Sequence, residues 1–142
     1  MQFIAFKIDD QSYAIELSSV DRIVLAAATV PLTHAPDMID GALNVQGNLI
    51  PLINLRRVLE LPEREIELKD QFIICKIDEK TVVLWVDDVN GAIDLSVEKI
   101  KNAQQHLDKM EHLKFAFRDN DETILIYDWA ALFRECLIGK VL

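Results

Sequence analysis

The sequence predicts a mainly β protein, and three observations lead to this class. Roughly nine or ten short apolar or alternating segments recur along the chain, with turn residues about every eight to twelve positions, which is typical of a β-barrel or sandwich. The length of 142 residues suits one domain with a core of its own. Apolar residues make up 51% of the chain, so the core needs no metal or disulfide.

The charge balance excludes two classes of partner. The chain has 15 basic and 24 acidic residues, whereas nucleic acids and anionic membranes bind to basic surfaces. The N-terminal MQFIAFKIDD resembles no signal peptide, and the longest uncharged apolar run, residues 25–32, is far too short to cross a membrane. We therefore expect a cytoplasmic protein with no direct membrane insertion.

The N-terminal segment predicts a β-hairpin. Residues 3–8 form an apolar strand, and the IDDQS that follows contains the residues of a turn. The next strand, SYAIEL, alternates between apolar and smaller or polar side chains, so we expect it to be half-buried. Its apolar face consists of Tyr13, Ile15 and Leu17.

Residues 20–24 fit two local structures. Their β-branched side chains favour a strand, whereas SSVD at 18–21 also fits a weak capping box for a helix. We favour the strand. A loop bracketed by Pro31 and Pro36 follows it and contains His34.

Two more strands are predicted around a pair of glycines. The strands cover residues 42–45 and 49–55. Gly41 and Gly47 lack the lysine and the helix that follow a phosphate-binding loop, so we assign them to backbone geometry at strand ends. Pro51 has no N–H to donate, and therefore marks an edge or a bulge.

A helical turn and a charged connection separate the two halves of the chain. Residues 56–61 predict the turn, which Pro62 stops. Residues 63–67, EREIE, predict a solvated connection. The second half then repeats the pattern of short strands and turns of the first half, which fits two small barrels within one domain.

The second half predicts hairpins and short helices. FIICKI and TVVLWVDDV form a hairpin around residues 78–80, and Asn90 and Gly91 are a typical turn pair. The remaining expectations are a strand at 92–95, a helix at 96–100 opened by Ser96, a helix at 101–114, a hairpin at 115–117 and 123–127, and an amphipathic helix at 129–137.

No arrangement of reactive residues predicts an enzyme. His34, His106 and His112 lack the spacing of metal ligands, and no serine lies in a G-x-S-x-G context. The adjacent Asp87 and Asp88 would face opposite sides of a strand, so we assign them to the turn that follows. We expect no catalysis, no cofactor and no metal.

The two cysteines predict no redox function. Cys75 and Cys136 lie among apolar neighbours and are far from the C-x-x-C spacing of a redox pair. We interpret them as buried free thiols.

Five motifs together resemble one protein family. They are FIAFKIDDQSYAIEL, SSVDRIV, TVPLTHAPDMIDGALNVQGNLIPLINL, TVVLWVDDVNGAIDL and ETILIYDWAAL, which follow one another between residues 3 and 133. Each is weak alone, but their order and spacing resemble the CheW family of chemotaxis coupling proteins and the similar regulatory domain of the kinase CheA.

The resemblance implies a fold and a function. It implies one CheW-like domain over residues 1–142, made of two intertwined SH3-like five-stranded barrels with a C-terminal helix, in agreement with the strand count. It also implies a non-catalytic adaptor at receptor arrays on the inner face of the membrane. The implied partners are the regulatory domain of a CheA-type histidine kinase and the cytoplasmic tips of methyl-accepting chemotaxis receptors.

The resemblance also implies site residues. We expect Val20, Arg22, Asn44, Gln46 and Gly47 at the receptor-binding face, although Val20 also fits the core, Asn44 a turn cap and Gly47 a simple turn. Structural roles at turns are expected for Gly41, Pro51 and Gly91.

Two of these positions depart from the family pattern. The family usually has glutamate where this chain has Arg22, and arginine where it has Gln46, and the two positions lie near each other. We expect Arg22 to donate to the Gln46 carbonyl group, with a local charge that rises from about zero to about +1. Such a change alters partner choice more than fold.

Two other functions remain open at this point. One is a diverged adaptor in another kinase pathway, such as surface motility. The other is a regulatory barrel that binds a small ligand, which ligand-dependent thermal stabilisation would reveal.

Overall fold

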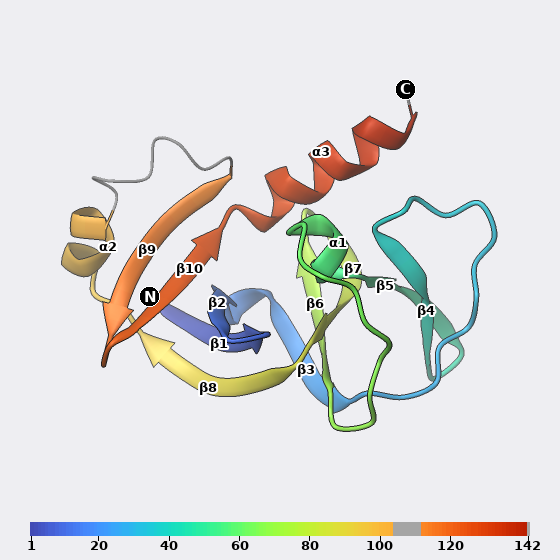
Figure 1. Cartoon of the computed structure of the whole chain (residues 1–142), viewed down its shortest axis with the longest axis horizontal. Helices are drawn as coiled ribbons and strands as arrows, with labels where there is room; N and C mark the ends of the chain where they lie inside the picture. Colours follow the sequence, from blue (N-terminus) through green and yellow to red (C-terminus); the bar gives the residue numbers. More distant parts are fainter. Residues whose placement is uncertain (104–111, 142) are drawn as a thin grey trace.

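The protein consists of two five-stranded sheets with short helices around them (Figure 1). The structure is a computed structural model that describes residues 1–103 and 112–141. The first sheet has the order β8-β1-β2-β10-β9 and the second the order β3-β6-β7-β5-β4. The first contains β1 (Gln2–Ile8), β2 (Gln11–Glu16), β8 (Asp88–Asp94), β9 (Leu113–Asp119) and β10 (Glu122–Tyr127), and the second contains β3 (Val20–Leu25), β4 (Ile39–Val45), β5 (Asn48–Ile53), β6 (Gln71–Ile77) and β7 (Lys80–Val86). The predicted fold class is confirmed.

The two sheets do not correspond to the two halves of the chain, so that expectation is wrong. The N-terminal hairpin lies between strands from the other end of the sequence: β1 pairs antiparallel with β8, and β2 pairs in parallel with β10. The whole second sheet is built from the segment between β2 and β8. Two neighbouring parallel strands need a long connection between them, and the whole second sheet is part of the connection between β2 and β10.

Within the described residues, four helical segments connect or cover the strands: η1 (Leu17–Ser19), α1 (Leu55–Val58), α2 (Val97–Ala103) and α3 (Trp129–Val141). The Asn54 side chain accepts hydrogen bonds from two backbone N–H groups of α1 and so ends β5 earlier than expected. Ser96 Oγ accepts from the backbone of Lys99 at 3.1 Å, as a helix cap does.

The expected helix over 101–114 is partly wrong. Helix α2 is described as far as Ala103, residues 104–111 lie outside the described residues, and Leu113 and Lys114 belong to β9 rather than to a helix. The strand expected at residues 20–24 is confirmed, since β3 covers Val20–Leu25, and the turn η1 before it has no side-chain cap.

Strand β2 is buried on both faces, so its expected half-burial is wrong. Tyr13 and Ile15 pack into the core between the sheets, while Ala14, on the opposite face, is 0% exposed and belongs to a separate cluster. Because β2 is the middle strand of its sheet, both of its faces are covered.

The main core is shared by the two sheets. Helix α3 contributes Trp129 and Phe133 to it, and Trp129 Nε1 donates to the Ala14 carbonyl oxygen at 3.0 Å. Each sheet also has a smaller cluster of its own. The shared cluster contains Ile4, Phe6, Ile8, Tyr13 and Ile15 of the first sheet and Ile53, Ile73, Cys75, Ile77, Leu84 and Val86 of the second.

Gly41 lies inside β4 and not at a turn. The register of β4 and β5 shifts between Ile39 and Ala42, so Gly41 is part of a bulge, with φ of +90°. A β-carbon at this position would lie 2.7 Å from the carbonyl oxygen of Val30. Val30 and Ala42 exchange two backbone hydrogen bonds, which attach the loop after β3 to β4. Glycine permits this close approach.

The expected turn at Asn90 and Gly91 is also a bulge. Both residues lie within β8, where the pairing with β1 shifts between Ala5 and Phe6 and leaves Asn90 as the extra residue. Pro51 lies in β5 opposite Ala42, next to the β4 bulge and before the parallel pairing with β7 begins at Leu52. Its lack of an N–H is tolerated there.

Candidate protein-binding surfaces

The titratable side chains of the described segments show no catalytic or metal-binding arrangement. Across residues 1–103 and 112–141, no group of three or more His, Cys, Asp or Glu side chains is placed to hold a metal ion. In the same residues no helix is long and apolar enough to span a bilayer. His34 is exposed in the loop after β3, His112 pairs with Glu135 of α3, and His106 lies outside the described residues.

The two thiols are held in their neutral form. Cys75 is fully buried, and this burial raises its pKa to about 12. Cys136 is half-buried, and burial together with the carboxylates of Glu135 and Glu60 raises its pKa. Because the thiolate is the reactive form, neither cysteine is activated as a nucleophile.

Val20 and Arg22 lie on β3, which is one of the two outer strands of the second sheet. Val20 is half-buried and packs against the shared core, whereas Arg22 is exposed. The pairing of β3 with β6 shifts between these two residues, so Asp21 is the extra residue of a bulge. The Arg22 guanidinium lies 3.5 Å from the Asp21 carboxylate.

Asn44, Gln46 and Gly47 form the exposed end of the β4–β5 hairpin. Asn44 Oδ1 accepts from the backbone N–H of Gly47 at 2.9 Å, which is the turn-capping role. Gln46 and Gly47 both have positive φ, and a β-carbon on Gly47 would meet open space.

The five predicted residues come from two different strand segments of the second sheet, β3 and the β4–β5 hairpin. Strands β3 and β4 stand at opposite ends of the strand order, and the expected hydrogen bond from Arg22 to Gln46 is absent from the contacts of the described residues. Arg22 instead pairs with the adjacent Asp21, the extra residue of the β3 bulge.

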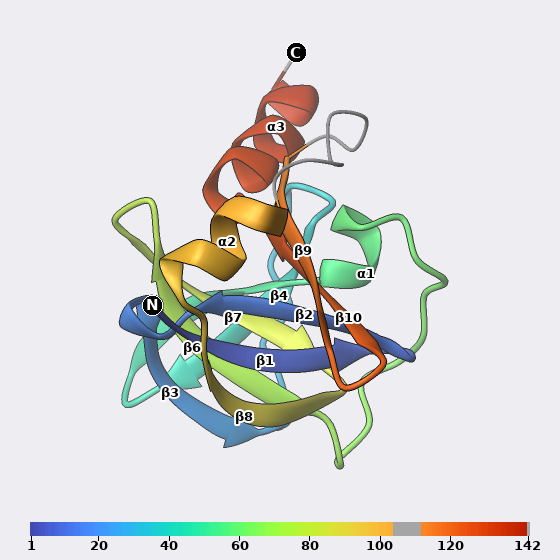
Figure 2. The ribbon, with the colours of Figure 1, turned by 90° about the vertical axis from the view of Figure 1, so that its left-hand side faces the viewer.

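The first candidate surface lies between the outer strands of the two sheets. Both β3 and β8 run along the lower side of the molecule (Figures 1 and 2). Four half-buried apolar side chains from this region cover the shared core, and we call them the inter-sheet face: Leu17, Val20, Ile23 and Val89. Arg22 and Asp21 are exposed beside it.

The second candidate surface lies at the end of the second sheet that is remote from α2 (Figure 1). Leu49 is 53% exposed at the start of β5, and Val30 and Leu32 of the preceding loop are also exposed. Large apolar side chains in solvent often mark protein-binding sites. We call this the outer-end surface: Val30, Leu32 and Leu49 with Asn44, Gln46 and Gly47.

An ion-pair network between the sheets was not predicted from the sequence. Residues 63–67 are not a purely solvated connection, because Arg64 donates to Asp70 at 2.8 and 2.9 Å and to Asp87 at 2.8 Å. Arg56, expected on a simple helical turn, is 4% exposed and also pairs with Asp87. Asp87 thus serves this network and not the expected turn.

Asp70 is the most deeply buried member, with an exposed fraction of 0%. Burial raises its pKa, but hydrogen bonds from Arg64, the Glu67 backbone and Trp85 Nε1 outweigh this and hold the pKa below its usual value. The Arg64 guanidinium also lies 5.5 Å from the centre of the Trp85 ring. No periodicity in the sequence indicated these partners, because Arg64 and Asp70 belong to the irregular connection before β6, whereas Trp85 belongs to β7.

Comparison with known proteins gives one consistent result. The model of the CheW-like domain matches residues 2–136. A protein named chemotaxis protein CheW from Treponema pallidum is 24% identical over 99% of this chain and 86% of its own, and one from Bacillus subtilis is 29% identical over 76% and 69%. The crystal structure of scaffolding protein TtCheW from Thermoanaerobacter tengcongensis superposes with a TM-score of 0.81 at 21% identity, over 93% of this chain and 91% of that one.

Proposed function

Since the chain belongs to the CheW-like domain family, we propose that it is a scaffold that couples chemotaxis receptors to a CheA-type histidine kinase. The observation that carries the proposal is the family match along residues 2–136, together with the same fold in a scaffolding protein. Scaffolds of this family are non-catalytic, in agreement with the neutral thiols. The protein acts through binding geometry.

The inter-sheet face is the surface we assign to the receptor tip. A receptor tip is a rigid helical hairpin, and helices bind through a row of apolar side chains to a partly buried apolar surface. Val20 and Ile23 from one sheet and Val89 from the other offer such a surface, with Arg22 beside it as a polar contact. We expect the interface to bury on the order of 1,000–2,000 Å² in total.

The outer-end surface is the one we assign to the regulatory domain of the kinase. Leu49 and Leu32 give it an apolar centre, and the exposed Gln46 gives it a polar edge, which is the usual composition of an interface. Two separate surfaces allow both partners to bind at once, and repeated weak contacts in an array add avidity.

Separate binding assays test the two assignments. Arg22→Glu should weaken co-sedimentation with receptor-containing membranes by about tenfold and leave binding to the kinase regulatory domain unchanged. Leu49→Glu should do the reverse, because it places a charge within an apolar contact.

Matched controls are available on the same chain. Arg118→Glu makes the same charge change on β9, and Leu68→Glu alters a side chain that is 86% exposed in the loop before β6. Both controls should bind normally. If Arg22→Glu and Leu49→Glu also bind both partners normally, the two surfaces are wrongly assigned; if the unaltered protein binds neither partner, the scaffold function itself is wrong.

A further inference from the structure

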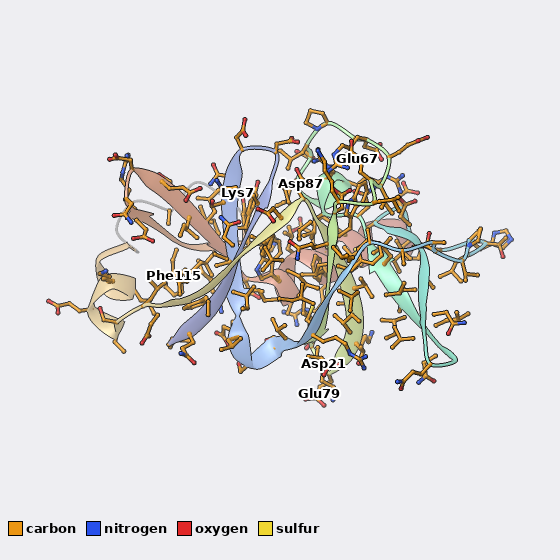
Figure 3. The ribbon with its side chains drawn as sticks, turned by 90° about the horizontal axis from the view of Figure 1, so that it is seen from below. Lys7, Asp21, Glu67, Glu79, Asp87 and Phe115 are labelled. Atoms are coloured by element: carbon orange, nitrogen blue, oxygen red, sulfur yellow. The ribbon has the colours of Figure 1, made fainter. Side chains whose placement is uncertain are left out.

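Asp87 stands at the point where the chain crosses from the second sheet to the first. Strand β7 ends at Val86 and β8 begins at Asp88. Figure 3 shows Asp87 between Lys7 of β1 and Glu67 of the loop before β6. Its backbone N–H donates to the Lys7 carbonyl oxygen at 3.0 Å, so the crossing point is attached to the first sheet.

The Asp87 carboxylate binds donors from both sheets. Arg56 Nη2 donates to its two oxygens at 2.9 and 3.0 Å, and Arg64 Nη2 donates at 2.8 Å. Both arginines belong to the part of the chain that connects β5 and β6 of the second sheet. From the first sheet, the backbone N–H of Asp9 in the β1–β2 turn donates at 2.7 Å.

The two arginines are themselves fixed in place. Arg56 also forms an ion pair with the Asp9 carboxylate at 2.8 Å and donates to the Pro62 carbonyl oxygen at 3.0 Å. Arg64 is held by two hydrogen bonds to the buried Asp70. The donors around Asp87 are therefore preorganised, and a planar guanidinium fork fixes direction as well as distance.

Two further hydrogen bonds cross between the sheets: the Val89 N–H of β8 donates to Gln71 Oε1 of β6 at 2.7 Å, and Arg134 Nη1 of α3 donates to Asp78 at 2.9 Å. The rest of the contact has a different character. It is the shared apolar core, and hydrophobic contact is non-directional, so it holds the sheets together without fixing their angle closely. Charge-assisted hydrogen bonds are directional. The angle matters for binding because Val20 and Ile23 of the inter-sheet face belong to one sheet, while Val89, two positions after Asp87, belongs to the other.

We propose that Asp87, held between Arg56 and Arg64, is a positioning residue that sets the angle between the two sheets. This angle determines the spacing of β3 and β8, and a rigid helical partner that contacts both strands depends on that spacing. A partner that binds within the second sheet alone does not depend on it. The choice of partner rests on the proposed function, whereas the effect on the angle does not.

Asp87→Asn tests the proposal, with Asp88→Asn as the matched control because Asp88 is exposed at the next position. Spin labels are attached to Thr81→Cys in the second sheet and Arg118→Cys in the first, in a Cys136→Ser background. Pulsed electron–electron double resonance then measures the distance between the two labels, and so between the sheets. Asp87→Asn should broaden or shift this distance distribution, and Asp88→Asn should leave it unchanged. Binding to receptor-containing membranes should fall about tenfold for Asp87→Asn only, with kinase-domain binding within about twofold.

The outcomes separate the two claims. An unchanged distance distribution overturns the positioning role even if binding falls, and a changed distribution with normal receptor binding overturns its importance for the partner. If the unaltered protein binds no partner, the scaffold function fails and the distance measurement alone decides the positioning role. If Asp87→Asn does not fold, Arg64→Lys replaces it, because one ammonium group does not pair with Asp70 and Asp87 in the same geometry and the distribution should broaden.

Discussion

At the scale of single residues, Gly41 shows how one backbone position allows the second sheet to close. Its φ of +90° and the Val30 carbonyl oxygen, 2.7 Å from where a β-carbon would lie, are two separate obstacles to any other residue. Gly47 in the same hairpin has φ of +88° but open space around it. A comparison of the two glycines therefore distinguishes the cost of an unfavourable φ from the cost of a steric clash.

We expect Gly41→Ala to lower the free energy of unfolding by roughly 2–4 kcal/mol, because it adds a clash with backbone to an unfavourable φ. Gly47→Ala, which has only the unfavourable φ, should lower it by about 1 kcal/mol. Urea titration of both variants measures the difference. Equal losses would mean that the loop at Val30 moves away easily and that the Val30–Ala42 bridge is not a tight constraint.

At the scale of elements, the burial of a helix cap decides how much the cap contributes to stability, whatever the length of the helix. Helix α1 has only four residues, but its cap, Asn54, is buried at 1% exposure, and α1 carries Arg56 into the network between the sheets. Helix α2 is longer, but its cap, Ser96, is exposed.

Asn54→Ala should therefore destabilise the protein by roughly 2 kcal/mol, since it removes both capping hydrogen bonds and leaves the buried N–H of Arg56 without its partner. Ser96→Ala should cost about 0.5–1 kcal/mol, because water replaces the lost acceptor. Thermal and urea unfolding measure both values. A larger loss for Ser96→Ala would contradict the argument.

The sequence predicted which elements exist far better than it predicted their partners. Alternation and turn residues located the hairpins, because these signals are local. The parallel pairing of β2 with β10 and the burial of β2 on both faces escaped prediction, since they depend on a strand more than 100 residues away. Gly91 looked like a turn because glycine favours turns and bulges alike.

The arrangement of the candidate residues in space could not be predicted from the sequence, for a similar reason. Val20 and Arg22 lie on one outer strand of the second sheet, and no local pattern relates them to the hairpin at Gln46. Arg64 lies in a run of charges that resembles a solvated surface, and only the fold brings the buried Asp70 to it.

At the scale of the whole molecule, the shared core makes two sheets into one unit. The main cluster takes side chains from both sheets and from α3, so neither sheet can lose its structure without exposing the apolar surface of the other. This supports the interpretation of residues 1–142 as one domain, which stays a prediction.

The two tryptophans allow a test of cooperativity, because Trp85 lies in the second sheet and Trp129 packs α3 against the first. We expect a single unfolding transition, so that Trp85→Phe and Trp129→Phe proteins each show a fluorescence midpoint that coincides with their own circular dichroism midpoint. Midpoints that differ between the two probes within one variant would show that the sheets unfold separately.

The interleaved strand order has a consequence for biosynthesis. The hairpin of β1 and β2 is synthesised before the second sheet, whereas β8 and β10, its neighbours in the finished sheet, are synthesised after it. The segment from β3 to β7 has all its strand partners within itself and is able to assemble while translation continues. A chain truncated before β10 would leave one edge of β2 without a hydrogen-bonding partner. We therefore expect truncated products to aggregate or to bind chaperones.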